Sequence, residues 1–213
     1  MDEILYPEQK QYLESQRRGQ EPLILAMEQY AAEHRIPILD WKSAEFLEQL
    51  VHIKRPRRVL EIGTAIAYSS IRIARSLRKK GSVTTIEKSA DNIVLANEYI
   101  QESGYQDKIE IVKGDALEVM SDMKKKYDFI FLDADKEDYM ELYRLSLGLL
   151  KRRGVLFVDN LLWHGFAASS SVPEKYMRST EHVRRFNEMF LSDSSISASI
   201  YPIGDGIGIG IKL

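Results

Sequence analysis

Two carboxylates and an amide follow successive apolar runs of the sequence. Asp133 comes directly after the run at 129–132, and Asp159 and Asn160 come directly after the run at 155–158. If these runs are neighbouring parallel strands, the three side chains converge at one edge of a cleft. Carboxylate and amide oxygens suit Mg²⁺ and leave coordination positions for water and substrate oxygens. The sequence therefore predicts a divalent-cation site.

Lys136 lies three residues after Asp133 and is the candidate proton acceptor. At the start of a helix its amine could face the same cleft, and a lysine there suits a general base. The alternative is a solvated lysine with no role in catalysis. Asp135 has a structural alternative as well, because it could cap a helix that begins at Lys136.

A second set of acids follows three earlier apolar runs and indicates the cofactor. The first of these runs ends in Glu61-Ile62-Gly63, and the loop over 61–69 contains a single glycine. Neither G-x-G-x-x-G nor G-x-x-x-x-G-K-[ST] occurs in the sequence. Dinucleotide sites and P-loop sites are therefore excluded. Glu61 could meet an ammonium group, and Gly63 leaves room for a thioether. Glu87, 24 residues after Gly63, could accept two ribose hydroxyls, and Asp115 an adenine amino group. Together they predict S-adenosylmethionine, although each acid alone could be a helix cap.

The elements that position these residues alternate regularly from residue 57 onward. Apolar runs that favour buried strands alternate with amphipathic stretches that favour helices. This alternation predicts βαβ units and a parallel sheet. The expected strands are at 58–62, 83–86, 109–112, 129–132 and 155–158, and the expected helices at 69–79, 90–103, 116–123 and 139–150.

The two ends of the chain follow other patterns. Residues 1–55 predict three helices: one over 6–16, one that begins at Pro22 and stops at Pro37, and one capped by Asp40. Near the other end we expect a long loop over 164–178 and a helix at 181–191. Two antiparallel edge strands at 196–201 and 207–213 complete the sheet. No domain boundary is visible, so we expect one domain over 1–213, with 1–55 as a helical extension.

Composition excludes several classes of protein. The 213 residues include no cysteine, which rules out disulfide scaffolds, cysteine zinc sites and thiol nucleophiles. The four histidines are scattered, so a histidine zinc site is not expected. A net charge of −2 gives no overall basic field. There is no apolar stretch long enough to span a membrane and no signal-peptide pattern at the N-terminus, so we expect a cytoplasmic protein.

The motifs resemble those of the cation-dependent class I methyltransferases, which include catechol and caffeoyl-CoA O-methyltransferases. The resemblance lies in Glu61-Ile62-Gly63-Thr64 with Tyr68-Ser69, in Leu132-Asp133-Ala134-Asp135-Lys136 and in Asp159-Asn160. It covers residues 35–213. It implies a Rossmann-like α/β fold with a mostly parallel seven-stranded sheet, an antiparallel last strand and helices on both faces. It also implies a homodimer.

The resemblance assigns roles to matching positions. The metal ligands would be Asp133, Asp159 and Asn160, and the catalytic residues Lys136 with Asp133. The cofactor contacts would be Ile38, Glu61, Gly63, Ser69, Glu87, Asp115, Ala116 and Asp133. One departure is Ala67, where the family often has glycine. We expect tighter packing there rather than lost binding.

Within this family, the whole sequence resembles the bacterial tRNA 5-hydroxyuridine methyltransferases. This resemblance implies 5-hydroxyuridine at the wobble position, position 34 of tRNA, as the substrate and 5-methoxyuridine as the product. The alternatives are a small catechol and, less favoured, a non-catalytic protein that binds S-adenosylmethionine. Most basic clusters precede strands or end helices, away from the cleft. The better-placed candidates for RNA contact are Arg17, Arg18, Tyr176, Arg178, Arg184 and Arg185. Trp163 and Phe166 follow the metal motif and could flank the substrate ring, although Phe166 could equally pack in the core.

Overall fold

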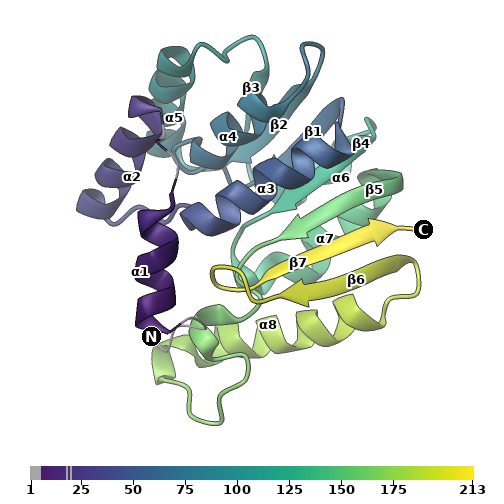
Figure 1. Cartoon of the computed structure of the whole chain (residues 1–213). Helices are drawn as coiled ribbons and strands as arrows, with labels where there is room; N and C mark the ends of the chain where they lie inside the picture. Colours follow the sequence, from purple (N-terminus) through teal and green to yellow (C-terminus); the bar gives the residue numbers. More distant parts are fainter. Residues whose placement is uncertain (1–5, 18, 20) are drawn as a thin grey trace.

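The apolar runs form one seven-stranded sheet in the order β3-β2-β1-β4-β5-β7-β6 (Figure 1). The computed structural model describes residues 6–17, 19 and 21–213. Six strands run parallel, and β7 is antiparallel to both of its neighbours. The expected Rossmann-like fold is confirmed. The strands are β1 Arg58–Ile62, β2 Ser82–Glu87, β3 Ile109–Lys113, β4 Tyr127–Leu132, β5 Leu150–Val158, β6 Ile196–Tyr201 and β7 Ile207–Lys212.

Helices cover both faces of the sheet because its strands are apolar on both sides. Alternate residues of β1 enter different cores: Val59 packs with α2, α3, α4 and α5, whereas Leu60 packs with α6, α7 and α8. The helices are α1 Pro7–Ser15, α2 Pro22–His34, α3 Trp41–Lys54, α4 Tyr68–Ser76, α5 Ala90–Ser103, α6 Ala116–Asp122, α7 Tyr139–Leu149 and α8 Glu174–Ser192, with short 3₁₀ turns η1 Lys136–Asp138 and η2 Trp163–Gly165.

The register of the central strands brings their carboxyl ends to one level. Ile62 pairs with Leu132, and Leu132 pairs with Val158. The pairing continues one residue further, because the Asp133 amide donates to the Ile62 carbonyl at 3.0 Å and the Asp159 amide donates to the Leu132 carbonyl at 3.1 Å. The loops after β1, β4 and β5 therefore begin side by side.

The segment before α8 differs from the sequence expectation. A loop over 164–178 is wrong, because α8 begins at Glu174, directly after Pro173. The first turn of α8 has no apolar periodicity, since most of its side chains are exposed. It is held instead by the Tyr176 ring, whose centroid lies 5.2 Å from that of Phe166. The expected cap of α3 is confirmed, with Asp40 accepting from the Lys42 amide at 3.0 Å.

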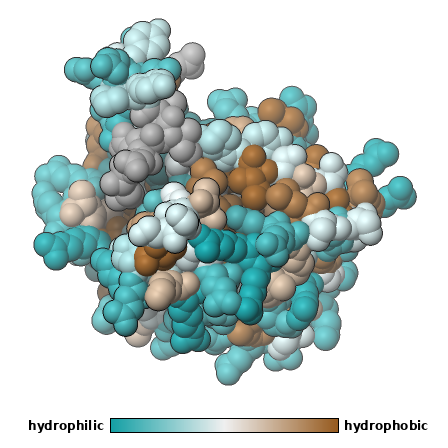
Figure 2. Space-filling model, turned by 90° about the horizontal axis from the view of Figure 1, so that it is seen from below, coloured by the Kyte–Doolittle hydropathy of each residue, from teal (hydrophilic) through white to brown (hydrophobic). Residues whose placement is uncertain are grey.

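Helix α1 stands apart from the other helices (Figure 1) and has no buried residue. Tyr6 and Tyr12 are 73% and 63% exposed. Viewed from below, the surface is mainly hydrophilic, with hydrophobic groups scattered over it (Figure 2). Within the described part of the chain, no helix combines the length and the apolar character that crossing a bilayer requires.

Candidate active site

A cavity of about 530 Å³ opens at the carboxyl ends of β1 to β5. This edge of an open α/β sheet is where ligands bind, and the volume suits a nucleoside-sized ligand. Nine of the residues expected at the site line the cavity: Ile38, Gly63, Glu87, Asp115, Ala116, Asp133, Lys136, Asp159 and Asn160. Glu61 and Ser69 lie behind it.

The loop after β1 packs directly on the end of β4. Gly63 has φ +98°, and a Cβ atom at this position would overlap the carbonyl oxygen of Asp133. Only glycine fits this close approach. Ala65 and Ala67 follow, with φ +45° and +67°. Ala67 is fully buried, so the methyl group that replaces the family's frequent glycine is packed inside the loop.

Glu61 is fully buried beneath this loop and binds the first residues of the helix that follows it. It accepts hydrogen bonds from the hydroxyls of Ser69, at 2.5 Å, and Ser70. Burial raises the pKa of Glu61 to about 7, although the two serine hydroxyls oppose the rise. Since Glu61 and Ser69 do not line the cavity, the structure places them where they hold the start of α4.

Glu87 and Asp115 face the cavity and also bind backbone amides. Glu87 accepts from the amides of Ala65 and Ser89, both at 2.9 Å. Asp115 accepts from the Leu117 amide at 2.9 Å and caps α6. Each carboxylate oxygen has a second lone pair. Bonds to backbone amides and a ligand contact are therefore compatible at both positions.

Two of the three candidate cation ligands, Asp133 and Asn160, contact the ammonium of Lys136. Its Nζ donates to Asn160 Oδ1 at 2.7 Å and to Asp133 Oδ1 at 3.3 Å. Burial and the nearby charge of Asp133 raise the pKa of Asp159 well above its ordinary value. The oxygens of Asp133 and Asn160 are thus already arranged around a positive charge, and Asp159 lies in the same cavity. A hard divalent cation fits this donor set, which consists of two carboxylates and an amide.

Histidines and further acids do not enlarge this donor set. Among residues 6–17, 19 and 21–213, there is no group of three or more histidine, aspartate and glutamate side chains that could hold a metal ion. The candidate set includes only two carboxylates, so the oxygen of Asn160 is required to complete it. Asp135 does not cap η1 with its side chain and instead pairs with Lys88 at 2.8 Å.

Tyr139 is a site residue that the sequence analysis missed. Its hydroxyl accepts from Lys136 Nζ at 2.6 Å and donates to the carbonyl oxygen of Asp159 at 3.0 Å. Lys136 also donates to the carbonyl oxygen of Ala134 at 3.0 Å. Tyr139 thus fixes the lysine relative to the end of β5. A tyrosine one turn after a candidate lysine was the available signal.

Asp205, in the turn between β6 and β7, was also missed. One of its oxygens accepts from the His164 amide at 2.6 Å, and the other lies 3.4 Å from Asn160 Nδ2. Because Asn160 Nδ2 faces Asp205, its Oδ1 is turned toward Lys136, from which it accepts a hydrogen bond. Asn160 and His164 both have positive φ, at 62° and 56°, so the turn supports a strained segment.

Aromatic side chains form one wall at the mouth of the cavity. Trp163 and His164 line it, and their ring centroids lie 5.0 Å apart. Tyr176 lies behind them, 5.7 Å from His164 and 6.2 Å from Trp163. Phe166 packs against Tyr176 and is not among the cavity-lining residues. The expectation of a flanking ring therefore applies to Trp163, whereas Phe166 supports the wall.

Most of the arginines considered for RNA contact have internal partners. Arg184 donates to the carbonyls of Ala167 and Phe166 at 3.0 and 2.9 Å, and so shapes the loop before α8. Arg17 pairs with Glu28. Arg178 is 81% exposed, with its Nε 3.8 Å from Glu137. The other two are Arg185, which pairs with Glu181, and Arg18, which lies outside the described residues.

Comparison with solved structures supports the same fold. The O-methyltransferase TomG from Streptomyces achromogenes, in complex with SAM, has a TM-score of 0.85 at 26% identity, covering 100% of this chain and 99% of that chain. The O-methyltransferase from Bacillus cereus, in complex with SAH, has a TM-score of 0.84 at 26% identity, covering 95% and 96%.

Comparison with known sequences gives the family. The caffeoyl-CoA O-methyltransferase of Populus kitakamiensis is 32% identical over 179 residues, which cover 80% of this chain and 76% of that protein. Caffeoyl-CoA O-methyltransferase 1 of Arabidopsis thaliana is 32% identical over 78% and 68%. A family model described as O-methyltransferase matches residues 18–213. The chain therefore belongs to the O-methyltransferase family.

Proposed function

We propose that this O-methyltransferase transfers a methyl group from S-adenosylmethionine to one of two adjacent oxygens on a planar ring. The observation that supports this reaction is a single cavity that contains Asp133, Asp159 and Asn160, two of them bonded to the Lys136 ammonium, together with Glu87 and Asp115. Oxygen ligands for a cation and hydrogen-bond acceptors for a nucleoside thus line the same cavity.

The cofactor would extend from the β1 loop toward β3. Glu87 offers acceptors for the ribose hydroxyls and Asp115 for the adenine amino group, while Ile38 and Ala116 provide apolar contacts. The relatives from Bacillus cereus and Streptomyces achromogenes were solved with SAH and SAM. A cofactor in this position would direct its methyl group toward Asp133 and Lys136.

Asp133, Asp159 and Asn160 would hold Mg²⁺ or another divalent cation. A bound cation would lower the pKa of a substrate hydroxyl and would stabilise the resulting oxyanion. Lys136, held by Tyr139, would accept the hydroxyl proton in its neutral amine form. The oxygen then forms a bond to the methyl carbon as the carbon–sulfur bond of the sulfonium breaks. Positioning of these groups would supply much of the rate enhancement.

Two substrate classes present adjacent oxygens on a planar ring, and each has an observation in its favour. The named plant relatives are caffeoyl-CoA O-methyltransferases, which supports a small catechol-type substrate. The second class is 5-hydroxyuridine at the tRNA wobble position, through its O4 and O5 atoms. The mouth of the cavity supports it, because Trp163 offers a ring face for an unpaired base and Lys175 and Arg178 are exposed on α8 nearby.

Helix α1 supports a homodimer. An isolated helix of nine residues is marginal in water, and α1 has no buried residue, while Tyr12 and Leu13 are exposed. A second copy of the chain would cover these side chains. Light scattering should give twice the mass of one chain, and a Tyr12→Glu/Leu13→Glu variant should shift toward a single chain. An unchanged mass in that variant would place the interface elsewhere.

The deciding experiment measures methyl transfer from radiolabelled S-adenosylmethionine to two acceptors. One is tRNA from a strain that lacks this gene, and the other is a simple catechol, each with Mg²⁺ or with a chelator. Metal-dependent label in tRNA, recovered as 5-methoxyuridine, supports the tRNA substrate and the cation together. Label in the catechol alone would support the proposed methyl-transfer reaction and would reject tRNA as the substrate. Label in neither favours a non-catalytic binding protein.

A further inference from the structure

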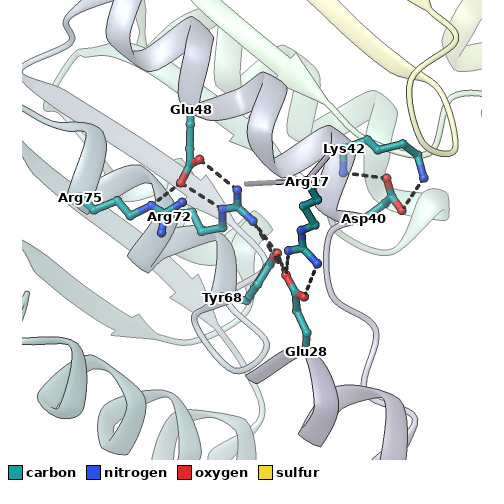
Figure 3. A network of polar contacts seen from close by, with 8 residues as sticks. All are labelled: Arg17, Glu28, Asp40, Lys42, Glu48, Tyr68, Arg72 and Arg75. Carbon is teal, nitrogen blue, oxygen red and sulfur yellow. Dashed lines mark hydrogen bonds and ion pairs between the residues drawn. The ribbon is translucent and has the colours of Figure 1, made fainter. Parts of the chain in front are cut away.

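A network of charged side chains lies outside the cavity and joins α2, α3 and α4 to the segment after α1 (Figure 3). At its centre is Arg72, whose side chain is fully buried. A buried guanidinium requires partners for its charge and its donors. Arg72 donates to both oxygens of Glu48, at 3.0 and 2.9 Å, and to the Tyr68 hydroxyl at 2.7 Å.

The outer half of the network depends on Arg17. Arg17 forms two hydrogen bonds to Glu28, at 2.9 and 2.6 Å, and its guanidinium lies 5.0 Å from the centre of the Trp41 ring. Glu28 also accepts from the Tyr68 hydroxyl at 2.6 Å. Tyr68 therefore accepts from Arg72 and donates to Glu28. A bidentate arginine–carboxylate pair fixes geometry well, so Arg17 fixes the acceptor on which Tyr68 depends.

Tyr68 connects this network to the cofactor loop. It is the first residue of α4, and it directly follows the loop that contains the left-handed Ala65 and Ala67. The next residue is Ser69, whose hydroxyl binds Glu61 at 2.5 Å. Fixing the Tyr68 hydroxyl therefore fixes the turn that leads from the cofactor loop into α4.

The opposite wall of the cavity is attached to the same network. Glu28 is on α2, and the connection from α2 to α3 contains Pro37 and Ile38, which line the cavity. Glu48 on α3 binds Arg72 and Arg75. The network thus links the helices before and after Ile38 to the helix that follows Ala65. Displacement of one wall would strain the contacts of the other.

We propose that Arg17 is a positioning residue for the cofactor site: by holding Glu28, it fixes Tyr68 and the first turn of α4 in the arrangement that binds the cofactor. The inference rests on the proposed function for the identity of that cofactor. Cofactor binding should then favour the docked position of Arg17 on Glu28, and this docking should in turn favour cofactor binding. The cation ligands, on β4 and β5, are outside this link.

The test measures two affinities in the full chain without any turnover. SAH binding is measured by calorimetry, and Mn²⁺ binding by electron paramagnetic resonance. Arg17→Ala should raise the Kd for SAH about fivefold to tenfold, within the range of site-to-site coupling, and leave the Kd for Mn²⁺ within twofold. Arg144→Ala is the matched control, because Arg144 pairs with Glu141 on the exposed side of α7. It should change neither affinity.

A second variant separates positioning from general destabilisation. Tyr68→Phe removes the hydroxyl that joins Arg72 to Glu28, so it should weaken SAH binding as Arg17→Ala does. The double variant should be little worse than either single variant, since both break one chain of contacts. In the wild-type chain, saturating SAH should slow tryptic cleavage after Arg17.

Two results would overturn the inference alone: an SAH affinity in Arg17→Ala equal to that of Arg144→Ala, or an equal loss of SAH and Mn²⁺ affinity. A wild-type chain that does not bind SAH would overturn the proposed function, and the inference with it.

Discussion

The ammonium of Lys136 has three protons and four oxygen acceptors within 3.3 Å. Two of these acceptors, on Asp133 and Asn160, are also candidate cation ligands. The other two are the Tyr139 hydroxyl and the Ala134 carbonyl, which are not ligands in the proposed cation site. The lysine would therefore keep two acceptors when a cation is bound. At the residue scale, the same side chain balances the charge of the site and is placed to move a proton.

Replacing this lysine should separate its two roles. In Lys136→Met, turnover should fall at least about a hundredfold, the usual loss when a general base is removed. Mn²⁺ should bind more tightly, because a competing positive charge has gone. Electron paramagnetic resonance and steady-state assays measure the two effects. Weaker Mn²⁺ binding would show that Lys136 supports the cation site instead of competing with it.

Removing a carboxylate ligand should weaken cation binding, which is the opposite of the effect expected for Lys136→Met. Asp159→Ala should abolish Mg²⁺-dependent turnover and leave SAH affinity near the wild-type value, because Asp159 is at the β5 end of the cavity. Asp107→Asn, an exposed aspartate in the turn before β3, is the control. Wild-type turnover of Asp159→Ala in Mg²⁺ would reject the metal assignment.

Glu61 should make stability depend on pH. Its pKa is raised by burial from 4.5 to about 7, so the folded state favours the protonated acid. Its contribution is most favourable below pH 4.5 and is lost between about pH 4.5 and 7, a change of about 3 kcal/mol. The Tm of the wild-type chain minus the Tm of the Glu61→Gln variant should be larger at pH 5 than at pH 8. A Tm difference that does not vary with pH would contradict the shifted pKa.

At the scale of elements, strand ends were predictable and the contacts between distant loops were not. Continuous apolar runs identify buried parallel strands, so Asp133 and Asp159 could be placed at the same sheet edge from the sequence. Tyr139 looked like an ordinary core residue of an amphipathic helix. Asp205 lies 45 residues from Asn160 and is brought to it only by the pairing of β5 with β7. No local pattern indicates such a partner.

The turn that contains Asp205 should control the adjacent site. Asp205→Ala removes the acceptor for the His164 amide and for Asn160 Nδ2, so Asn160 loses its orientation. Loss of such an outer partner typically reduces metal affinity by about tenfold to a hundredfold. Mn²⁺ titration should show this loss while SAH affinity is retained. Unchanged Mn²⁺ affinity would limit Asp205 to a role in folding.

At the scale of the whole molecule, charge is divided between the two edges of the sheet. The loops before β1, β2 and β4 and the exposed start of β5 present clusters of basic residues that include Arg57, Lys80, Lys125 and Arg152, whereas the cavity at the other edge is lined by acids. This arrangement is not visible in a net charge of −2. It becomes evident only when the topology assigns each loop to an edge.

A tRNA substrate should make catalysis sensitive to salt. Phosphate contacts release counterions, so KM for tRNA should rise steeply between about 50 and 200 mM salt. KM for a small catechol should change little over the same range, because no polyanion is bound. Parallel assays of both acceptors measure the difference. A KM for tRNA that is independent of salt would indicate that the RNA is not held by its backbone.

The contact between Gly63 and the Asp133 carbonyl has a consequence for how this site can vary. The turn that would hold the methyl donor lies directly against the backbone of the residue that would hold the cation, with no side chain between them. A side chain at position 63 would push these two turns apart, so a single substitution there would disturb both pockets at once. Position 63 is therefore closed to every residue with a Cβ atom, whichever substrate the site accepts.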